Sequence, residues 1–261
     1  MPNVRRIVPF SLLLACSLLT GSYAPPELAP TAVTGTYATV SAATCGASQL
    51  GAMAIPTDSA YEILRCNGST WDHYVSGIKV VPPVFGNFTW ANQSSATTDT
   101  AHGGIIITAP ANGGTNNVNM LVQSLPGSTY TLETAFRISA VGSNSVAGGL
   151  VQRDSVAGTL VLSGVTYTNG WGYLGFNYNS PTSASSGIYA DIQYRRDVYW
   201  AKTVVDGTNR TQWYSNDGVN YIAGSVVSKT SFVTPNQNGF AINVSNASYG
   251  GSVWLLHWTT Y

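Results

Sequence analysis

The chain has 261 residues, of which only 8% are charged, and its formal net charge is zero. An average soluble domain carries about 25% charged residues. Nucleic-acid binding needs Lys and Arg gathered on one face to displace counterions, whereas the 11 basic side chains here are scattered among 11 acids. The composition argues against a nucleic-acid partner. Abundant β-branched, aromatic and Gly residues, with Asn and Asp between them, predict many short strands and tight turns rather than helices.

The N-terminal segment 1–24 has the features of an export leader. Arg5 and Arg6 precede an apolar stretch that is too short to span a bilayer but is typical of a signal sequence. Within it, Leu13-Leu14-Ala15-Cys16 resembles a bacterial lipobox, which implies lipidation of Cys16 as the only attachment to a membrane. The alternative is an uncleaved segment that packs inside an assembled particle. Residues 25–44, rich in Pro, Ala and Thr, are expected to form a tether.

The three cysteines bear on whether the protein functions in an oxidising compartment. If Cys16 is removed or lipidated, Cys45 and Cys66 remain as one possible pair. A disulfide closing about 20 residues would stabilise a small module by roughly 3 kcal/mol and would indicate an oxidising destination. The alternative is two reduced, buried thiols. There is no CxxC spacing and the three histidines are far apart in sequence, so we expect no metal site.

Residues 45–82 are predicted to form a small β-hairpin module. From Leu50 to Tyr74 the chain alternates as strands do, and Asn67-Gly68 favours a type I′ hairpin turn between two of them. A three-stranded meander of this size buries too little surface to fold alone, so it needs a disulfide, an oligomer or a docking partner. Residues 45–71, which end in Asn-Gly-Ser-Thr-Trp, resemble a module near the N-termini of phage tail-fibre and secreted bacterial surface proteins.

Pro82-Pro83 marks a boundary, and residues 83–261 are predicted to form an all-β, antiparallel β-sandwich. Asp206-Gly207 and Asp217-Gly218 separate three consecutive strands with turn chemistry that allows positive φ. The expected strands are Gly104–Thr108, Val118–Gln123, Tyr130–Ile138, Gly149–Arg153, Thr159–Leu162, Trp171–Phe176, Ile188–Tyr194, Val198–Val205, Thr211–Ser215, Val219–Ala223, Gly239–Val244 and Val253–Trp258.

The run from Tyr199 to Tyr221, with its Ser-Asn-Asp-Gly hairpin and flanking aromatics, resembles concanavalin A-like, laminin-G-like jelly rolls. The segments FTWANQSSATTD, GGLVQRDSVAGTLV and SFVTPNQNGFAINVSN are similar to versions of this domain attached to phage tail and virion-surface proteins. The resemblance covers residues 84–261. It implies a jelly-roll fold, which serves lectins, adhesins, glycanases and structural decorations alike.

Catalytic chemistry is not indicated. Glycosidases need two carboxyl groups about 5 to 10 Å apart, and the chain has only three glutamates, of which Glu133 alone lies in the sandwich. There is no Gly-x-Ser-x-Gly nucleophile elbow. Calcium held by Asp191 and Asp197 stays open, although their spacing is not diagnostic. We therefore expect no catalytic residue and no required cofactor.

The stretch from Trp171 to Trp213 is the best candidate for recognition, because it combines aromatic rings that could stack on sugars with planar donors. The alternative is that these aromatics fill the sandwich core. The residues that we expect to bind glycans are Trp171, Tyr173, Tyr178, Tyr194 and Arg195.

The sequence thus predicts a non-enzymatic structural or attachment protein, exposed on a virion as a phage tail or capsid-surface component, that contacts host-surface glycans or neighbouring subunits. The first alternative is a secreted or lipid-anchored lectin of the bacterial envelope, and the second is a glycan-cleaving enzyme. Oligomers are expected, because attachment proteins gain avidity from multiple copies.

Overall fold

The computed structural model describes residues 45–47, 50–54, 63–140, 146–167, 171–190, 198–245 and 248–261. Strands make up most of this part of the chain, and the short 3-10 turn η3 (Phe85–Asn87) joins the small sheet to the sandwich. The prediction of an all-β protein is confirmed. The predicted leader and tether, residues 1–44, lie outside the described residues, as does Cys16.

The small N-terminal sheet, sheet A, has four antiparallel strands in the order β1-β2-β3-β4. The sequence predicted three. The fourth forms because Ser76 and Gly77 both have positive φ, 50° and 78°, as a two-residue type I′ turn requires. The strands are β1 (Met53–Ala54), β2 (Ile63–Cys66), β3 (Trp71–Val75) and β4 (Ile78–Val80).

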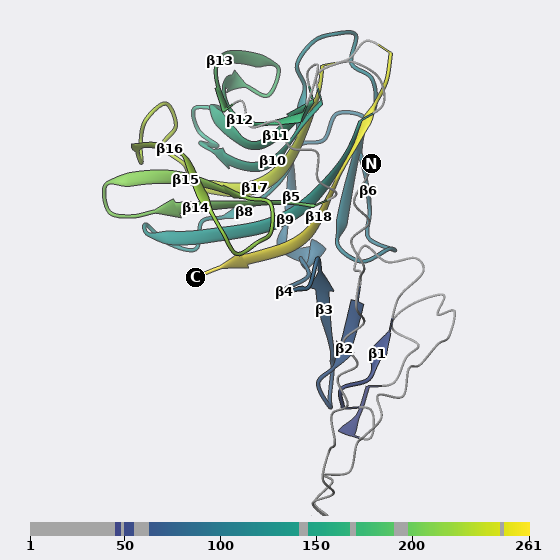
Figure 1. Cartoon of the computed structure of the whole chain (residues 1–261). Coiled ribbons are helices and arrows are strands. Elements are labelled where there is room, and N and C mark those ends of the chain that lie inside the picture. The colour runs from purple at the N-terminus through teal and green to yellow at the C-terminus, as the bar shows by residue number, and fades with distance from the viewer. Residues whose placement is uncertain are drawn as a thin grey trace, which may run out of the picture.

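Two seven-stranded antiparallel sheets form the sandwich above sheet A in Figure 1. Sheet B contains, in spatial order, β13 (Ser183–Ala190), β12 (Trp171–Ser180), β11 (Leu160–Tyr167), β10 (Val146–Arg153), β17 (Gln237–Val244), β8 (Val118–Ser124) and β5 (Thr89–Asn92). Sheet C contains β16 (Ile222–Ser228), β15 (Asn209–Ser215), β14 (Tyr199–Val205), β9 (Tyr130–Ala140), β18 (Gly251–Thr260), β7 (Ile105–Ala109) and β6 (Thr97–Asp99).

The main core lies between the inner faces of sheets B and C. Alternate residues of each strand point inward, as in β7, where Ile105 and Ile107 are buried and Thr108 is exposed. Phe136 of sheet C meets Phe240 of sheet B edge to face, with ring centroids 5.7 Å apart. Burying each such side chain contributes roughly 1.5 to 3 kcal/mol, and this cluster is the main source of the sandwich's stability.

A second apolar cluster fills the outer face of sheet B. It includes Met120, Leu162 and Tyr178, which are almost fully buried although they point away from the main core. Sheet B curves over at its β12–β13 end (Figure 1). The turn between β12 and β13 reaches back to β8, where the Val118 N–H donates to the Pro181 carbonyl oxygen at 2.9 Å. This face is therefore a closed interior.

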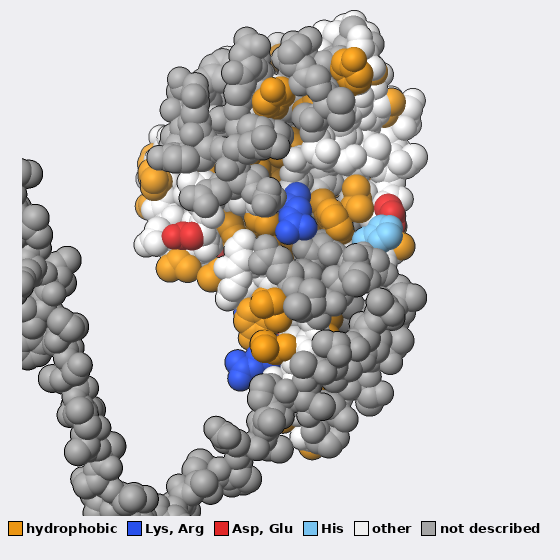
Figure 2. Space-filling model, turned by 45° about the vertical axis from the view of Figure 1, so that its right-hand side comes forward, with side chains coloured by type: hydrophobic (Ala, Val, Ile, Leu, Met, Phe, Trp, Pro, Cys, Tyr) orange, Lys and Arg blue, Asp and Glu red, His pale blue; other side chains and the backbone are white. Residues whose placement is uncertain are grey.

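A third cluster joins sheet A to the outer face of sheet C. Leu64 and Val75 of sheet A pack with Trp200 and Leu256 of the sandwich. The surface is hollowed where the smaller body meets the sandwich, and hydrophobic side chains gather at that notch (Figure 2). The docking partner that the small meander needs is thus the sandwich itself.

Two hydrogen bonds also hold sheet A against the sandwich. The Val81 N–H donates to His257 Nδ1 at 2.7 Å, and the Trp258 N–H donates to the Val81 carbonyl oxygen at 3.0 Å. Val81, the residue after β4, thus connects sheet A to β18 of the sandwich.

The predicted hairpins form, but with longer turns than expected. Val205 pairs with Arg210, so the first turn holds four residues, and neither Asp206 nor Gly207 has a positive φ. The Asp206 carboxylate instead accepts the backbone N–H groups of Thr208 and Asn209. These bonds to Asn209 and Thr208 lower the pKa of Asp206 below its ordinary value. Aspartate was thus a correct turn signal with a different mechanism.

Asp217 closes the second turn in the same way, by accepting the N–H groups of Val219 and Asn220. The predicted strand Val219–Ala223 is wrong for this reason, because the turn extends through Asn220 and β16 begins at Ile222. Of the predicted strand Ile188–Tyr194, β13 covers 188–190 and the remainder lies outside the described residues. The edge strands β5 and β6 were not predicted, because they are short and polar.

Candidate functional site

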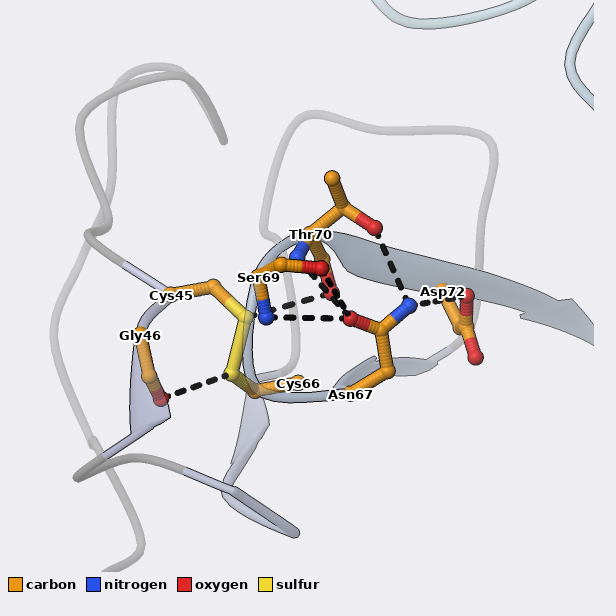
Figure 3. The surroundings of a disulfide bond; sticks show 7 residues. All are labelled: Cys45, Gly46, Cys66, Asn67, Ser69, Thr70 and Asp72. Carbon is orange, nitrogen blue, oxygen red and sulfur yellow. Dashed lines mark hydrogen bonds between the residues drawn. A yellow bond between two sulfur atoms is a disulfide. The ribbon is translucent and has the colours of Figure 1, made fainter.

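Cys45 and Cys66 form a disulfide whose Cα atoms lie 5.5 Å apart, across 21 positions of sequence (Figure 3). Of the two alternatives for these residues, the structure contains the bonded pair. Because disulfide sulfur carries no proton, the 3.1 Å approach of Cys45 Sγ to the Thr70 carbonyl oxygen is a packing contact. The disulfide ties the N-terminal end of the module to β2.

The Asn67 loop next to the disulfide differs from the expected two-residue turn. Cys66 pairs with Trp71, so four residues form the loop, and only Gly68 has a positive φ, of 96°. Asn67 Oδ1 accepts the N–H groups of Ser69 and Thr70 at 3.1 and 2.9 Å, as Figure 3 shows. These bonds give the loop a structural role.

Tyr173, one of the predicted glycan-binding residues, is a core residue. It is 4% exposed, and its ring lies 4.3 Å from that of Tyr214 across the two sheets. Its hydroxyl donates to the Ser215 carbonyl oxygen at 3.0 Å. The expectation that Tyr173 stacks on a sugar is wrong, because both faces of the ring are covered.

The expectation that Tyr178 binds glycans is wrong for a different reason. It points to the outer face of sheet B, but that face is filled, and the side chain is 1% exposed. Its hydroxyl accepts from Asn243 Nδ2 at 3.2 Å. Trp171 begins β12 opposite Tyr167, and its side chain lies outside the described residues. Tyr194 and Arg195 also lie outside them.

Part of the outer face of sheet C, beside sheet A, carries half-buried polar and aromatic side chains. Its centre is Glu133 on β9, whose carboxylate accepts two tyrosine hydroxyls. Tyr221 donates to Oε1 at 2.7 Å and Tyr261 donates to Oε2 at 3.1 Å. Tyr221 also packs against the cluster that joins sheet A to sheet C. The carboxylate is thus held in place at the edge of the module.

Lys202 and Trp213 extend this surface across the neighbouring strands. Lys202 pairs with Glu133 on one side and with Trp213 on the other, so the three side chains lie in one row on one face. Lys202 Nζ lies 3.8 Å from the centroid of the Tyr221 ring, a cation–π contact. We define the sheet C patch as Glu133, Lys202, Trp213, Tyr221 and Tyr261.

The two tyrosine hydroxyls of the sheet C patch are protonated at neutral pH. Burial and the adjoining Glu133 carboxylate raise the pKa of Tyr221, and burial and the same carboxylate raise that of Tyr261. Both phenols therefore stay protonated and act as donors to Glu133. The patch presents aromatic rings, one acceptor group and one ammonium, a combination suited to binding neutral polar molecules.

A second carboxylate, Asp217, interacts electrostatically with Tyr221. Backbone and side-chain bonds from Asn220, with further bonds from Val219 and Ser215, hold its pKa far below the ordinary value. Asp217 therefore stays ionised and cannot donate a proton to a leaving group. Within the described ranges there is no group of three or more His, Cys, Asp or Glu that could hold a metal ion. No helix in the same ranges is long and apolar enough to cross a membrane.

No protein-family model and no curated protein sequence matches this chain. A solved structure of a functionally unknown protein from Saccharomyces cerevisiae is similar, with a TM-score of 0.50 and 14% identity over 69% of this chain and 98% of that chain. A GH43 protein from Bacillus licheniformis has a TM-score of 0.50 and 10% identity, over 80% of this chain and 45% of its own.

An engineered GH43 glycoside hydrolase, described as both endo-xylanase and exo-arabinofuranosidase, has a TM-score of 0.50 and 18% identity. It is matched over 77% of this chain and 44% of its own, so the chain spans less than half the length of either hydrolase. These likenesses show a shared β-sandwich fold and thus agree with the predicted architecture.

Sequence reasoning did not propose the sheet C patch, although one signal was available. The Asp206 turn fixes the register of β14 and β15 and makes Lys202 and Trp213 direct neighbours. Glu133 and Tyr261 are 128 positions apart, and no local pattern places them together.

Proposed function

We propose that this chain is a non-enzymatic attachment protein that binds carbohydrate through the sheet C patch. The observation that carries the proposal is the row of Trp213, Lys202 and Glu133 on a rigid sheet, flanked by the Tyr221 ring. Aromatic faces stack on the C–H faces of sugar rings, while a carboxylate and an ammonium bond to their hydroxyls. The β-sheet fixes these groups before the ligand arrives, which lowers the entropic cost of binding.

A binding assay on a glycan array, followed by calorimetry on the best ligand, tests this proposal. Trp213→Ala and Tyr261→Ala should each weaken binding at least tenfold. Tyr249→Ala is the matched control, because Tyr249 is also an exposed tyrosine, at 51% against 70% for Tyr261. Loss of binding in the control, or unchanged binding in both patch variants, would show that the patch is not the site.

The alternative of a glycan-cleaving enzyme has less support. A glycosidase needs one carboxyl group that stays protonated, whereas the Asp217 carboxylate beside the sheet C patch is held ionised. Polysaccharide turnover that disappears in Glu133→Gln but persists in Asp154→Asn, a change in an unrelated loop, would establish an enzyme instead.

The setting is a further proposal. Support for a virion surface comes from the sequence resemblance of residues 45–71 and 84–261, and support for the bacterial envelope comes from Cys16 in its lipobox-like context. Mass spectrometry of the native protein separates them. An unprocessed N-terminus favours assembly on a virion, while a diacylated Cys16 favours the envelope. Self-association is part of either proposal, and light scattering that reports a monomer at micromolar concentration would count against it.

A further inference from the structure

A chain of buried polar side chains crosses the sandwich at one end, between the two sheets. Gln152 and Asn238 come from sheet B, and the other members come from sheet C. Such groups are costly to bury unless each one is hydrogen-bonded. The five members, each at most 6% exposed, are Thr203, Gln212, Gln152, Tyr130 and Asn238.

The hydrogen bonds of this chain all run in one direction. Thr203 Oγ1 donates to Gln212 Oε1 at 2.6 Å, and Gln212 Nε2 donates to Gln152 Oε1 at 3.4 Å. Gln152 Nε2 donates to the Tyr130 hydroxyl oxygen at 2.8 Å, and that hydroxyl donates to Asn238 Oδ1 at 3.1 Å. The chain ends on Asn238 Nδ2, which has no acceptor among the described residues. With the Asn238 amide reversed, the Tyr130 hydroxyl oxygen would accept from both amides and its own hydrogen would lack an acceptor, so one unmet donor would remain.

Arg210 supplies a second donor without an acceptor. The residue is 3% exposed, and its Nη2 donates to the Ser231 carbonyl oxygen at 3.1 Å, while Nη1 has no acceptor in the described part of the chain. The ion pairs found there, Lys79–Asp72 and His102–Asp99, do not involve Arg210. A guanidinium does not lose its proton at neutral pH, so the described residues leave a buried, uncompensated positive charge.

The two donors lie at the same end of the sandwich. Arg210 pairs with Val205, and Val205 pairs with Tyr130, so all three lie in one row on the inner face of sheet C. Two strand spacings of about 4.8 Å separate the Arg210 and Tyr130 backbones, and the two side chains lie close enough to interact electrostatically. Tyr130 is in turn bonded to Asn238. The loop after β16 covers this end of the sandwich, because the Ser231 carbonyl oxygen accepts from Arg210 and Val233 is buried.

We propose an internal anion site at this end of the sandwich, in which Arg210 Nη1 and Asn238 Nδ2 hold a small inorganic anion of the size of chloride. Both unmet groups are donors, and the net charge of the described groups is positive, so the ligand must accept hydrogen bonds and carry negative charge. Water would satisfy the donors but would leave the charge uncompensated. Because Arg210 is 3% exposed and Asn238 is fully buried, a large organic anion does not reach these donors. The ion would bridge sheets B and C and stabilise the sandwich.

Thermal unfolding of the full chain tests the site at constant ionic strength. Replacing sodium gluconate, whose anion is too large to enter, by sodium chloride or bromide should raise the Tm by about 5 °C when the halide is well above its dissociation constant. Crystals grown in bromide should show an anomalous peak between Arg210 and Asn238. Equal Tm values in gluconate and halide, with no anomalous peak, would overturn the proposal and assign the space to water.

Two variants locate the effect. Arg210→Met keeps the length of the side chain without its charge, and it should abolish the dependence of Tm on halide. Arg153→Met is the matched control, since Arg153 also carries a buried nitrogen without an acceptor but donates to Gln237 at 2.6 Å on the other face of sheet B. This control should keep the halide dependence. If Arg210→Met does not fold, the bromide peak in the unaltered protein decides the question.

Discussion

The outer faces of the two sandwich sheets follow the same alternation of side chains, yet different elements cover them. Sheet B closes its own outer face, because the β12–β13 turn bonds back to Val118 of β8. Sheet C receives a separate body, sheet A, which covers Trp200 and Leu256 and leaves the sheet C patch beside it. Alternation therefore tells which residues share a face, while coverage tells whether that face can bind a ligand. Phe176 and Tyr178 on the outer face of sheet B are therefore packed in an apolar cluster, whereas Tyr261 beside sheet C is exposed.

The largest expected effect is that of Tyr178→Ala on the outer face of sheet B. Because Tyr178 is 1% exposed in an apolar cluster, its truncation should cost about 3 to 5 kcal/mol of unfolding free energy. Urea unfolding measures this cost. A loss of less than about 0.5 kcal/mol would mean that this face is an open groove, since exposed side chains are usually that tolerant. Tyr249→Ala provides the exposed-tyrosine control for this experiment as well.

The next effect concerns the stability of sheet A itself. Replacing Cys45 and Cys66 by Ser removes a cross-link that spans 21 positions. Loop-closure entropy predicts a loss of about 3 kcal/mol in the local stability of the module. Hydrogen exchange should accelerate in β1–β4 and stay unchanged in β8, β10 and β17 of sheet B. Equal acceleration in both sheets would show that sheet A and the sandwich unfold as one unit.

A smaller effect is expected from pH, through His257 at the junction. Burial lowers the pKa of His257 below 6.5, and its Nδ1 must stay unprotonated to accept the Val81 N–H. Above pH 6.5 the imidazole is neutral in both states, so its contribution to stability is complete. As the pH falls below 6.5, the unfolded chain binds a proton that the folded chain refuses, and stability decreases until the pKa of the folded state is reached.

The variant His257→Asn isolates this contribution, since Asn keeps an acceptor near the Nδ1 position and cannot be protonated. Between pH 7 and pH 5, the unfolding free energy of this variant should fall by about 1 kcal/mol less than that of the unaltered protein. His73, whose pKa burial also lowers, should cause the same trend in the unaltered protein and in the variant. His102→Asn is the control, because that side chain is 48% exposed. If this control removes as much pH dependence as His257→Asn, the junction is not the cause.

The smallest expected effect is the loss of stability when the Tyr261 side chain is removed from the sheet C patch. Tyr261→Ala should change the unfolding free energy by less than about 0.5 kcal/mol, because the side chain is 70% exposed. Urea unfolding of this variant, beside that of Tyr178→Ala, then compares the two faces directly. A large loss on Tyr261→Ala would mean that its bond to Glu133 holds the sheet together, and the two faces would then be alike.

Local chemistry was sufficient to predict most of the fold. Hairpins centred on Asp206 and Asp217 form where the sequence placed them, because a carboxylate that accepts backbone N–H groups acts within a few residues. The pairing of Cys45 with Cys66 was one of two alternatives, and the structure contains it. Short polar edge strands such as β6 were missed, because their alternation is too brief to stand out.

The candidate site was less predictable, because burial of an aromatic depends on distant contacts. The burial of Tyr178 depends on the hydrogen bond between Pro181 and Val118, which lies 63 positions earlier in the chain. No period in the segment 171–178 distinguishes a ring that faces solvent from one that faces a closed interior. In the same way, Glu133 becomes part of a site only when β9, β14 and β18 are brought together, and Tyr221 reaches it from the Asp217 turn.

Val81 lies where the chain passes from sheet A to the sandwich, and its N–H and carbonyl groups are both bonded to β18. A connecting segment with free peptide groups would act as a swivel, and the two bodies would then change direction independently. Here both peptide groups of Val81 are hydrogen-bonded to β18, so sheet A and the sandwich are held in one orientation at this point. A force applied to the chain ahead of Cys45 would therefore rotate sheet A and the sandwich together. The sheet C patch would keep a constant orientation relative to the direction of that force.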